Sequence, residues 1–203
     1  MVPVRMNPLV TGVLLAAGGG RRLGGRPKAL LMHRGRPLVE HAIRSLRDGG
    51  CDRIVVVLGA AADEVRSRSS LAGCAVTVNP EWQQGMGGSL RAGLAALAGT
   101  GTEAALVLLV DQPGVGAEAV SRVRAAHTSR ASLAAASYDG TRGHPVLLGA
   151  DHWAGVSAGA TGDQGARPHL WEHRAALTLV ECADVAEAYD IDTPEDLRHL
   201  AGP

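Results

Sequence analysis

Strand-like and helix-like segments alternate along the first two thirds of this 203-residue chain. Runs rich in Val, Ile, Leu and Ala predict strands at Val10–Leu15, Arg53–Leu58, Ala75–Val78, Ala105–Val110 and Ser132–Ala136. Helical periodicity predicts helices at Pro37–Asp48, Ala62–Ser69, Gly88–Ala98 and Ala117–Thr128. This alternation is typical of an α/β fold with a doubly wound, mostly parallel, Rossmann-like sheet. Such sheets bind ligands at the carboxyl ends of their strands, so functional residues are expected there.

The pattern changes after Tyr138. Asp139-Gly140 is a turn signal that predicts a hairpin with a strand through His144–Leu148, a small antiparallel insertion. A glycine-rich region follows at Gly155–Gly165. The last predicted elements are a helix at Ala166–Arg174, a strand at Leu177–Glu181 and a helix that begins in "DTPED". No long linker interrupts the chain, so we predict one domain over 1–203 with two halves, 8–137 and 138–203.

Charge and composition argue against several classes of function. Lys plus Arg and Asp plus Glu number 20 each, so no overall positive charge favours nucleic acid or an anionic membrane. Three Trp, two Tyr and no Phe leave few base-stacking platforms. The chain shows no signal peptide and no membrane span, and its three cysteines lack metal or redox spacing. We therefore expect a cytoplasmic protein with no nucleic-acid or membrane partner.

The stretch "LLAAGGGRRLGGRPKALL", from Leu14 to Leu31, follows the first predicted strand. Its glycines let backbone N–H groups approach a phosphate closely, and Arg21, Arg22 and Lys28 supply positive charge. The spacing matches neither a Walker A motif nor a G-x-G-x-x-G dinucleotide fingerprint. We predict a loop that binds a polyphosphate; the alternative is a flexible arginine-rich surface loop.

A second motif, "VLLVDQP", carries a buried strand to Asp111 at the same sheet edge. Mg²⁺ takes one or two carboxylates together with phosphate oxygens, so a carboxylate beside a phosphate-binding loop suits it. Asp111 is the first predicted metal ligand, and a turn cap before Pro113 is the alternative.

These two motifs and five further blocks resemble the nucleotidyltransferases that include molybdenum-cofactor cytidylyltransferase and guanylyltransferase. The first stretch is similar to the family signature L-A-A-G-x-x-x-R-x-G-x-x-K. The further blocks are "GRPLVEHAI", "NPEWQQGMGGSLRAGL", "GHPVLL", "GDQGAR" and "DIDTPEDL", and together they cover nearly the whole chain. "GHP" and "GDQGAR" resemble the cytidylyltransferase branch in particular.

The resemblance implies roles for individual residues. The nucleotide would contact the half at 8–137, through Leu15, Ala16, Ala17, Gly18, Gly19, Arg22, Lys28, Asn79, Gly85 and Ser89. The acceptor would contact the half at 138–203, through Gly143, His144, Pro145, Asp163, Gly165 and Arg167. Arg22, Lys28 and Asp111 would be catalytic, and Asp111 and Asp192 would bind Mg²⁺. Capping of the last helix is an equally good reason for a carboxylate at Asp192.

The implied reaction transfers CMP from CTP to a molybdopterin-type cofactor and releases pyrophosphate, with a molybdenum hydroxylase as a further partner. "LAAG" resembles the cytidylyl version, since guanylyl members tend to carry Gly in place of Ala17, and one methyl group beside the base can exclude a purine. The alternatives are another nucleotide such as GTP, a phosphosugar or phosphoalcohol acceptor, and a non-catalytic protein that binds the finished cofactor.

Some residues depart from the family or stand outside it. Val110 occupies a position where members often carry Gly, which could crowd the metal site, and Gly155–Gly162 matches the family only loosely. The tryptophans Trp82, Trp153 and Trp171 are expected to fill cores, although Trp82 lies in a pocket block. The remaining histidines show no metal-ligand spacing and are expected to be surface or packing residues: His33, His41, His127, His152, His169, His173 and His199.

Overall fold

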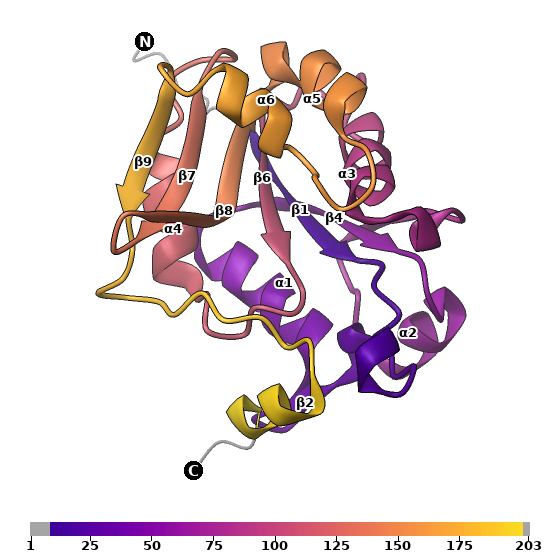
Figure 1. Cartoon of the computed structure of the whole chain (residues 1–203). Coiled ribbons are helices and arrows are strands. Elements are labelled where there is room, and N and C mark those ends of the chain that lie inside the picture. Colours follow the sequence, from indigo (N-terminus) through magenta and orange to yellow (C-terminus); the bar gives the residue numbers. More distant parts are fainter. Residues whose placement is uncertain (1–8, 201–203) are drawn as a thin grey trace, which may run out of the picture.

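The computed structural model describes residues 9–200, and the expectation that the chain opens without a signal peptide falls largely on residues outside that range. Its centre is a seven-stranded sheet with the order β5-β4-β1-β6-β8-β7-β9 (Figure 1). The strands are β1 (Val10–Ala16), β4 (Arg53–Leu58), β5 (Ala75–Val78), β6 (Ala104–Leu109), β7 (Leu133–Tyr138), β8 (Thr141–Gly149) and β9 (Leu177–Glu181). Only β8 runs antiparallel to its neighbours. The predicted α/β class with a mostly parallel sheet is confirmed.

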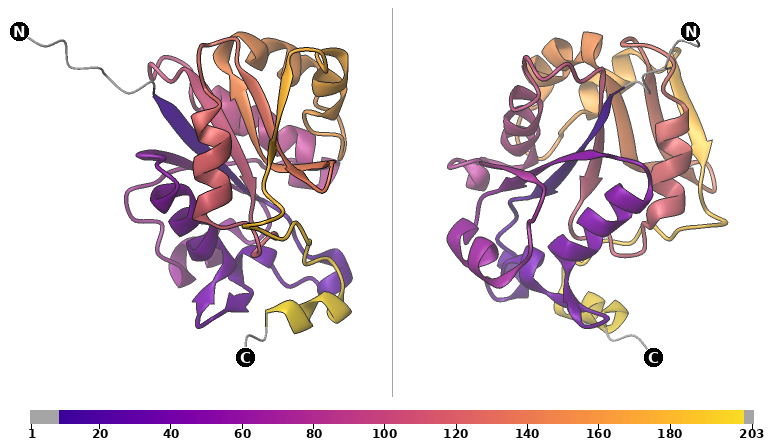
Figure 2. Two further views of the ribbon diagram at one scale, coloured as in Figure 1. Left: turned by 90° about the vertical axis from the view of Figure 1, so that its left-hand side faces the viewer. Right: turned by 180° about the vertical axis from the view of Figure 1, so that it is seen from behind.

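Helices cover both faces of this sheet (Figure 2). One face carries α1 (Leu38–Asp48) and α4 (Ala117–Ala125), and the opposite face carries α3 (Met86–Ala95), α5 (Trp153–Gly159) and α6 (Arg167–Glu172). A shorter helix, α2 (Ala62–Arg68), follows β4. Five apolar side chains of α1 recur at helical spacing and are all buried: Leu38, Val39, Ala42, Ile43 and Leu46. That apolar stripe is what holds α1 on the sheet.

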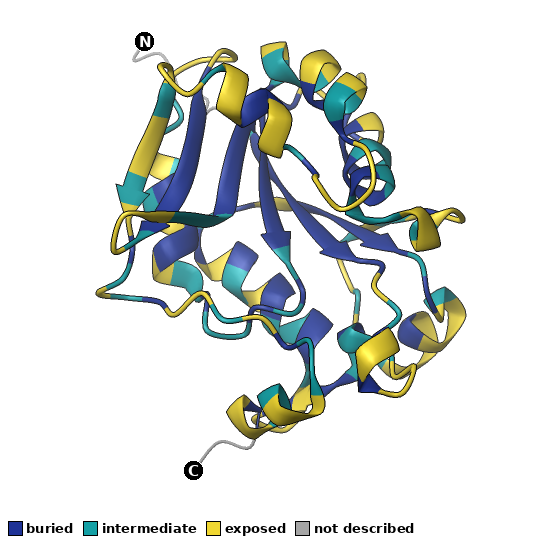
Figure 3. Ribbon diagram, viewed as in Figure 1, coloured by how far each residue is buried: buried dark blue, intermediate teal, exposed yellow. Residues whose placement is uncertain are grey.

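Strand β1 is buried on both faces, which explains its nearly continuous apolar sequence. Leu14 belongs to the apolar cluster under α1 and α4, whereas Val13 belongs to the cluster under α3. Neither side chain is exposed, and burial of each contributes about 1.5–3 kcal/mol. Helix α3 approaches β1 closely because Gly93 has no side chain: a Cβ there would lie 2.6 Å from Val13 Cγ1. Figure 3 shows the central strands of the sheet buried, whereas the edge strand β9 is partly or fully exposed along its length.

The hairpin after Tyr138 is confirmed. β7 and β8 pair antiparallel, and the turn between them places Asp139 at φ 51° and Gly140 at φ 81°. Left-handed values at both positions are those that an Asp-Gly turn provides. β8 then enters the sheet between β6 and β7, so the insertion is part of the central sheet.

Several predicted boundaries differ from the structure. The glycine-rich region contains α5, which the sequence did not reveal because Val156 is its only buried side chain. A two-stranded sheet of β2 (Met32–His33) and β3 (Arg36–Pro37) precedes α1, so Pro37 lies just before the helix rather than in its first turn. The last predicted helix is a 3₁₀ helix, η5 (Pro194–His199). The other 3₁₀ turns are η1 (Arg21–Leu23), η2 (Lys28–Leu30), η3 (Trp82–Gln84) and η4 (Ala150–His152).

The segment between β9 and η5 crosses the carboxyl edge of the sheet (Figure 1). The Glu187 N–H donates to Gly114 O at 3.2 Å, and the Ile191 N–H donates to Asp111 O at 2.9 Å. These bonds bring the C-terminal residues to the end of β6. Among the helices of residues 9–200, none combines the length and apolar character that crossing a membrane requires.

Candidate functional site

The glycine-rich loop lies at the carboxyl end of β1. Its turn at Gly20 has φ 58°, and a Cβ there would lie 2.0 Å from Arg26 O, so only glycine fits. The turn leads into η1, which carries Arg22, and η2 follows with Lys28 at its start. The loop thereby holds an exposed guanidinium and a half-buried ammonium at one edge of the sheet.

A cavity of about 400 Å³ opens between this loop and the N-terminus of α3. Its walls include eight of the residues predicted to bind nucleotide: Leu15, Ala17, Gly18, Gly19, Arg22, Lys28, Gly85 and Ser89. Two predicted residues lie elsewhere. Ala16 faces the core under α1 and α4, and Asn79 lies behind the wall, where its Nδ2 donates to Ser89 Oγ at 3.1 Å.

Lys28 lies between two carboxylates. Its Nζ donates to Asp111 Oδ2 at 2.6 Å and also to Asp192 Oδ1. Burial alone would lower the pKa of Lys28, but Asp111 and Asp192 outweigh burial and raise it. The ammonium therefore stays protonated and holds the loop against the end of β6.

Asp192 does not cap η5. The cap is Thr193, whose backbone N–H and Oγ1 both donate to Asp196 Oδ2, at 2.8 and 2.9 Å. The Asp192 carboxylate is thus directed to Lys28 and to the side of the site where Asp111 lies. Val110 is 4% exposed and packs in the core under α1 and α4, so its side chain does not crowd the carboxylates.

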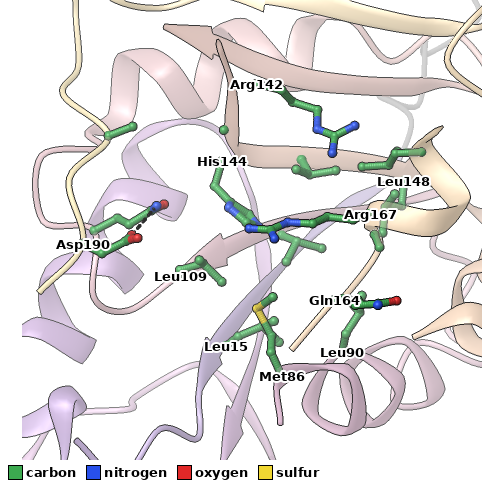
Figure 4. Close-up of a pocket in the computed structure, with 18 of the residues that line it drawn as sticks. Leu15, Met86, Leu90, Leu109, Arg142, His144, Leu148, Gln164, Arg167 and Asp190 are labelled. Carbon is green, nitrogen blue, oxygen red and sulfur yellow. Dashed lines mark hydrogen bonds between the residues drawn. The ribbon is translucent and has the colours of Figure 1, made fainter. Parts of the chain in front are cut away.

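A second cavity of about 280 Å³ adjoins the first, and Leu15, Met86 and Leu109 line both. Figure 4 shows His144 from β8 and Arg167 from α6 reaching into it, with Asp190 at its other end. Four residues predicted to bind the acceptor line this cavity: Gly143, His144, Gly165 and Arg167. Two do not: Pro145 is absent from the wall, and Asp163 lines the first cavity, where it accepts the Met86 N–H at 3.2 Å.

The second cavity is polar at both ends. Burial, together with the guanidinium groups of Arg167 and Arg142, lowers the pKa of His144 to about 4, so its imidazole is neutral at pH 7. At the other end, burial raises the pKa of Asp190, although Gln112 donates to its Oδ1 at 2.7 Å. Gln112 Oε1 is buried and has no hydrogen-bond partner within residues 9–200. The cavity therefore offers two guanidinium groups, a neutral imidazole and an unpaired carbonyl oxygen to a ligand.

Sequence reasoning missed some of these residues. Gln112 and Asp190 stand inside the matching blocks "DQP" and "DIDTPEDL", beside the aspartates that were chosen, so their position was the available signal. Met86 and Leu109 carry no chemical signal and are found only from the cavity walls. Trp82, expected to fill a core, lines the first cavity, where a Cβ on Gly19 would lie 2.7 Å from its ring.

Three of the histidines expected to be surface or packing residues lie together in the structure. His152, His169 and His173 each offer a ring nitrogen within 4.8 Å of the other two. His169 and His173 stand four positions apart, a spacing that places them on one face of a helix and was an available signal. His152 lies 17 positions before His169 and joins them only through the fold.

The fold is that of an α/β nucleotidyltransferase, with a glycine-rich loop after β1 and Asp111 after β6 at the carboxyl edge of the sheet. The profile of the MobA-like NTP transferase domain matches residues 12–177, and the chain belongs to that family. It is 44% identical over 199 residues to nicotine blue oxidoreductase of Paenarthrobacter nicotinovorans. That alignment covers 95% of this chain and 97% of the other protein. It is 28% identical over 197 residues to molybdenum cofactor guanylyltransferase of Shewanella halifaxensis, covering 96% of this chain and 95% of that protein.

Solved structures agree with this assignment. The crystal structure of an Rv0371c homologue from Mycobacterium sp. strain JC1 matches with a TM-score of 0.84 and 30% identity, covering 96% of both chains. A manganese complex of Rv0371c from Mycobacterium tuberculosis matches with a TM-score of 0.76 and 27% identity, covering 95% of this chain and 97% of that one.

Proposed function

We propose that this chain is a metal-dependent nucleotidyltransferase that transfers CMP from CTP to a molybdopterin-type acceptor and releases pyrophosphate. The observation that carries the proposal is Lys28, held between Asp111 and Asp192 at the edge of a cavity that a glycine-rich loop lines. In this proposal the half at residues 8–137 binds the nucleotide, and the half at residues 138–203 supplies most of the residues that bind the acceptor.

The loop residues position the triphosphate. Gly18, Gly19, Arg22 and Lys28 line the space that the phosphates would fill, where glycine backbone N–H groups and two cationic side chains would bind them. An acceptor phosphate oxygen bonds to the α-phosphorus while the bond to the β-phosphate bridging oxygen breaks. Arg22 and Lys28 then neutralise the charge that grows on the departing pyrophosphate, so positioning and electrostatics provide the catalysis.

Asp111 and Asp192 fit a divalent cation. Two carboxylates already share one positive charge, the Lys28 ammonium, and oxygen ligands suit Mg²⁺ or Mn²⁺. The metal would supply charge neutralisation at the triphosphate. Its binding to the two carboxylates would compete with their bonds to Lys28 and leave that ammonium free to contact a phosphate. Manganese in the Rv0371c complex supports the choice of a divalent cation.

The second cavity suits the acceptor. Arg142 and Arg167 offer two guanidinium groups to a phosphate, and neutral His144 and Gln112 offer hydrogen bonds to a polar ring. Leu15, Met86 and Leu109 line both cavities, so the two cavities are neighbours and an acceptor in the second would lie next to a nucleotide in the first.

The first experiment measures thermal stability with CTP, GTP, ATP and UTP, with and without Mg²⁺ or Mn²⁺. A ligand at one hundred times its dissociation constant stabilises the folded state by about 2.7 kcal/mol. We expect stabilisation by CTP with metal, and transfer of labelled CMP from CTP to molybdopterin. Preference for GTP, the nucleotide implied by the guanylyltransferase relative, would correct the base alone. No response to any nucleotide would reject the transferase and favour an accessory protein that binds the finished cofactor.

A second candidate is an oxidoreductase that acts on nicotine blue. It is favoured by the 44% identity to the protein of that name over 95% of the chain. The apolar walls of the joined cavities, Leu15, Met86, Leu90, Leu109 and Leu148, also suit a flat aromatic ligand. An assay for conversion of nicotine blue with NADH or NADPH separates the two. Turnover of the dye without nucleotide-dependent pyrophosphate release would replace the first proposal with this one.

A further inference from the structure

Three histidine rings lie together where η4 packs beside α6, outside both cavities. His152 ends η4, His169 lies within α6 and His173 follows that helix. The rings of His169 and His173 are stacked with centroids 4.1 Å apart, and the ring of His152 lies 5.1 and 5.3 Å from them. One ring nitrogen of each lies within 4.8 Å of the other two. None of these rings lines the cavities described above.

Backbone hydrogen bonds fix the tautomers of two of these rings. His152 Nε2 donates to Ala131 O at 3.0 Å, so its Nδ1 carries the lone pair. His173 Nδ1 donates to His169 O at 2.9 Å, so its Nε2 carries the lone pair. A metal-binding histidine usually donates its other ring N–H, the one that does not face the metal, to a carbonyl or carboxylate oxygen. That hydrogen bond fixes the tautomer and the orientation of the ring.

The third ring is held in place from both sides. His169 is 8% exposed, and its Nε2 donates to His152 Nδ1 at 3.0 Å, a hydrogen bond that a metal bound by both nitrogens would replace. Gly155 of α5 makes room for it, since a Cβ there would lie 2.6 Å from His169 Cε1. Burial first, and then His173 and His152, lower the pKa of His169.

We propose that His152, His169 and His173 bind one Zn²⁺ ion, or a divalent transition metal of similar preference, and that the ion ties α6 to η4. Three imidazole nitrogens without a carboxylate favour such metals over Mg²⁺ or Ca²⁺. At Zn–N distances of about 2.0–2.1 Å, tetrahedral ligands lie about 3.4 Å apart, so small ring rotations close the site. His152 and His173 are half-buried, which leaves the fourth position to water.

The proposed ion stands behind the acceptor cavity. Arg167 and Leu170 of α6 line that cavity, whereas His169 and His173 belong to the same helix and its end. A bound metal would therefore fix the helix that supplies Arg167. The inference does not depend on which reaction the cavities perform.

The test uses untagged protein stripped with a chelator, titrated with Co²⁺ and with Zn²⁺ in competition with a chromophoric chelator. We expect one ion per chain, the intense visible absorption of tetrahedral Co²⁺, and a higher melting temperature with Zn²⁺. All titrations are also made with protein that carries Asp111→Asn, because this substitution removes the carboxylate site that could also bind the metal. The absence of the tetrahedral Co²⁺ absorption in both Asp111→Asn and the wild type would overturn the proposal, and the wild-type measurement needs no variant to fold.

Two variants and one control locate the ion. His152→Ala and His173→Ala each remove one half-buried ligand, and we expect Zn²⁺ affinity to fall at least tenfold in both. His199→Ala removes an exposed histidine far along the chain and should bind Zn²⁺ like the wild type. Equal affinity in His173→Ala and the wild type would show that the three rings only pack against one another. Circular dichroism of each stripped variant checks that the fold is retained.

Discussion

Lys28 is the single residue on which the proposed chemistry most depends. Its Nζ donates to two carboxylates at the edge of the 400 Å³ cavity, so Lys28→Ala removes a charge that would face the triphosphate of the proposed nucleotide. We expect kcat for CMP transfer to fall about 10²–10³-fold, as when one transition-state donor is lost. Arg26→Ala is the matched control, because Arg26 is an exposed cation of the same loop that does not line the cavity. Equal losses in the two variants, measured at saturating CTP and metal, would remove Lys28 from the mechanism.

Ala17 is the residue expected to select the base. It is 7% exposed and lines the proposed nucleotide-binding cavity beside Gly18. One methyl group in a pocket changes discrimination by about 1–3 kcal/mol, or roughly 10–200-fold. Ala17→Gly should therefore raise kcat/KM for GTP relative to CTP within this range. An unchanged ratio of the two kcat/KM values would assign base selection to other residues. Trp82, which lines the same cavity, would be the next residue to test.

At the scale of elements, the N-terminus of α3 is joined to the loop before α6. Gly87 N–H donates to Gly162 O at 2.8 Å, and Gly85 has φ 109°. A Cβ on Gly85 would lie 2.4 Å from the carbonyl carbon of Gly162, so the two backbones could not keep this distance. This contact closes one side of the nucleotide cavity.

Gly85→Ala should therefore separate α3 from the 162–163 loop. Gly99→Ala is the control, since Gly99 has φ 71° but nothing within 4 Å of a Cβ. Backbone strain alone costs about 1–2 kcal/mol at Gly99, and the clash at Gly85 should add to that and weaken CTP binding. Urea unfolding and CTP titration of both variants measure this. A Gly85→Ala protein as stable as Gly99→Ala, with unchanged CTP affinity, would contradict it.

Sequence reasoning succeeds where one element carries the signal. The alternation of strands and helices predicts the sheet, and the loop after β1 predicts a site at its carboxyl edge, where the 400 Å³ cavity lies. It fails where residues meet through the fold. Asp192 was named by the family resemblance alone, and it reaches Lys28 because the segment after β9 crosses the sheet edge. Met86, which no pattern indicated, lines both cavities from the start of α3. Helix α5 was missed because its small residues bury little apolar surface.

The stability of the whole molecule should fall in mild acid. The folded protein lowers the pKa of His144 to about 4, and burial also lowers the pKa of His41. Between pH 6.5 and 4 the unfolded chain therefore binds protons that the folded chain does not. The stabilisation is complete above pH 6.5 and is lost as pH falls through the folded pKa, by up to about 3 kcal/mol for His144.

Urea unfolding of metal-free protein at pH 7 and pH 5 measures this loss. His144→Gln should unfold with a smaller pH difference than the wild type, because its side chain does not titrate in this range. His199→Gln, which alters an exposed histidine, should keep the wild-type difference. If His144→Gln and the wild type lose the same free energy between the two pH values, His144 is not held neutral in the acceptor cavity. The imidazole would then be free to carry charge to a phosphate there, and the division of roles between His144 and the two arginines would have to be reversed.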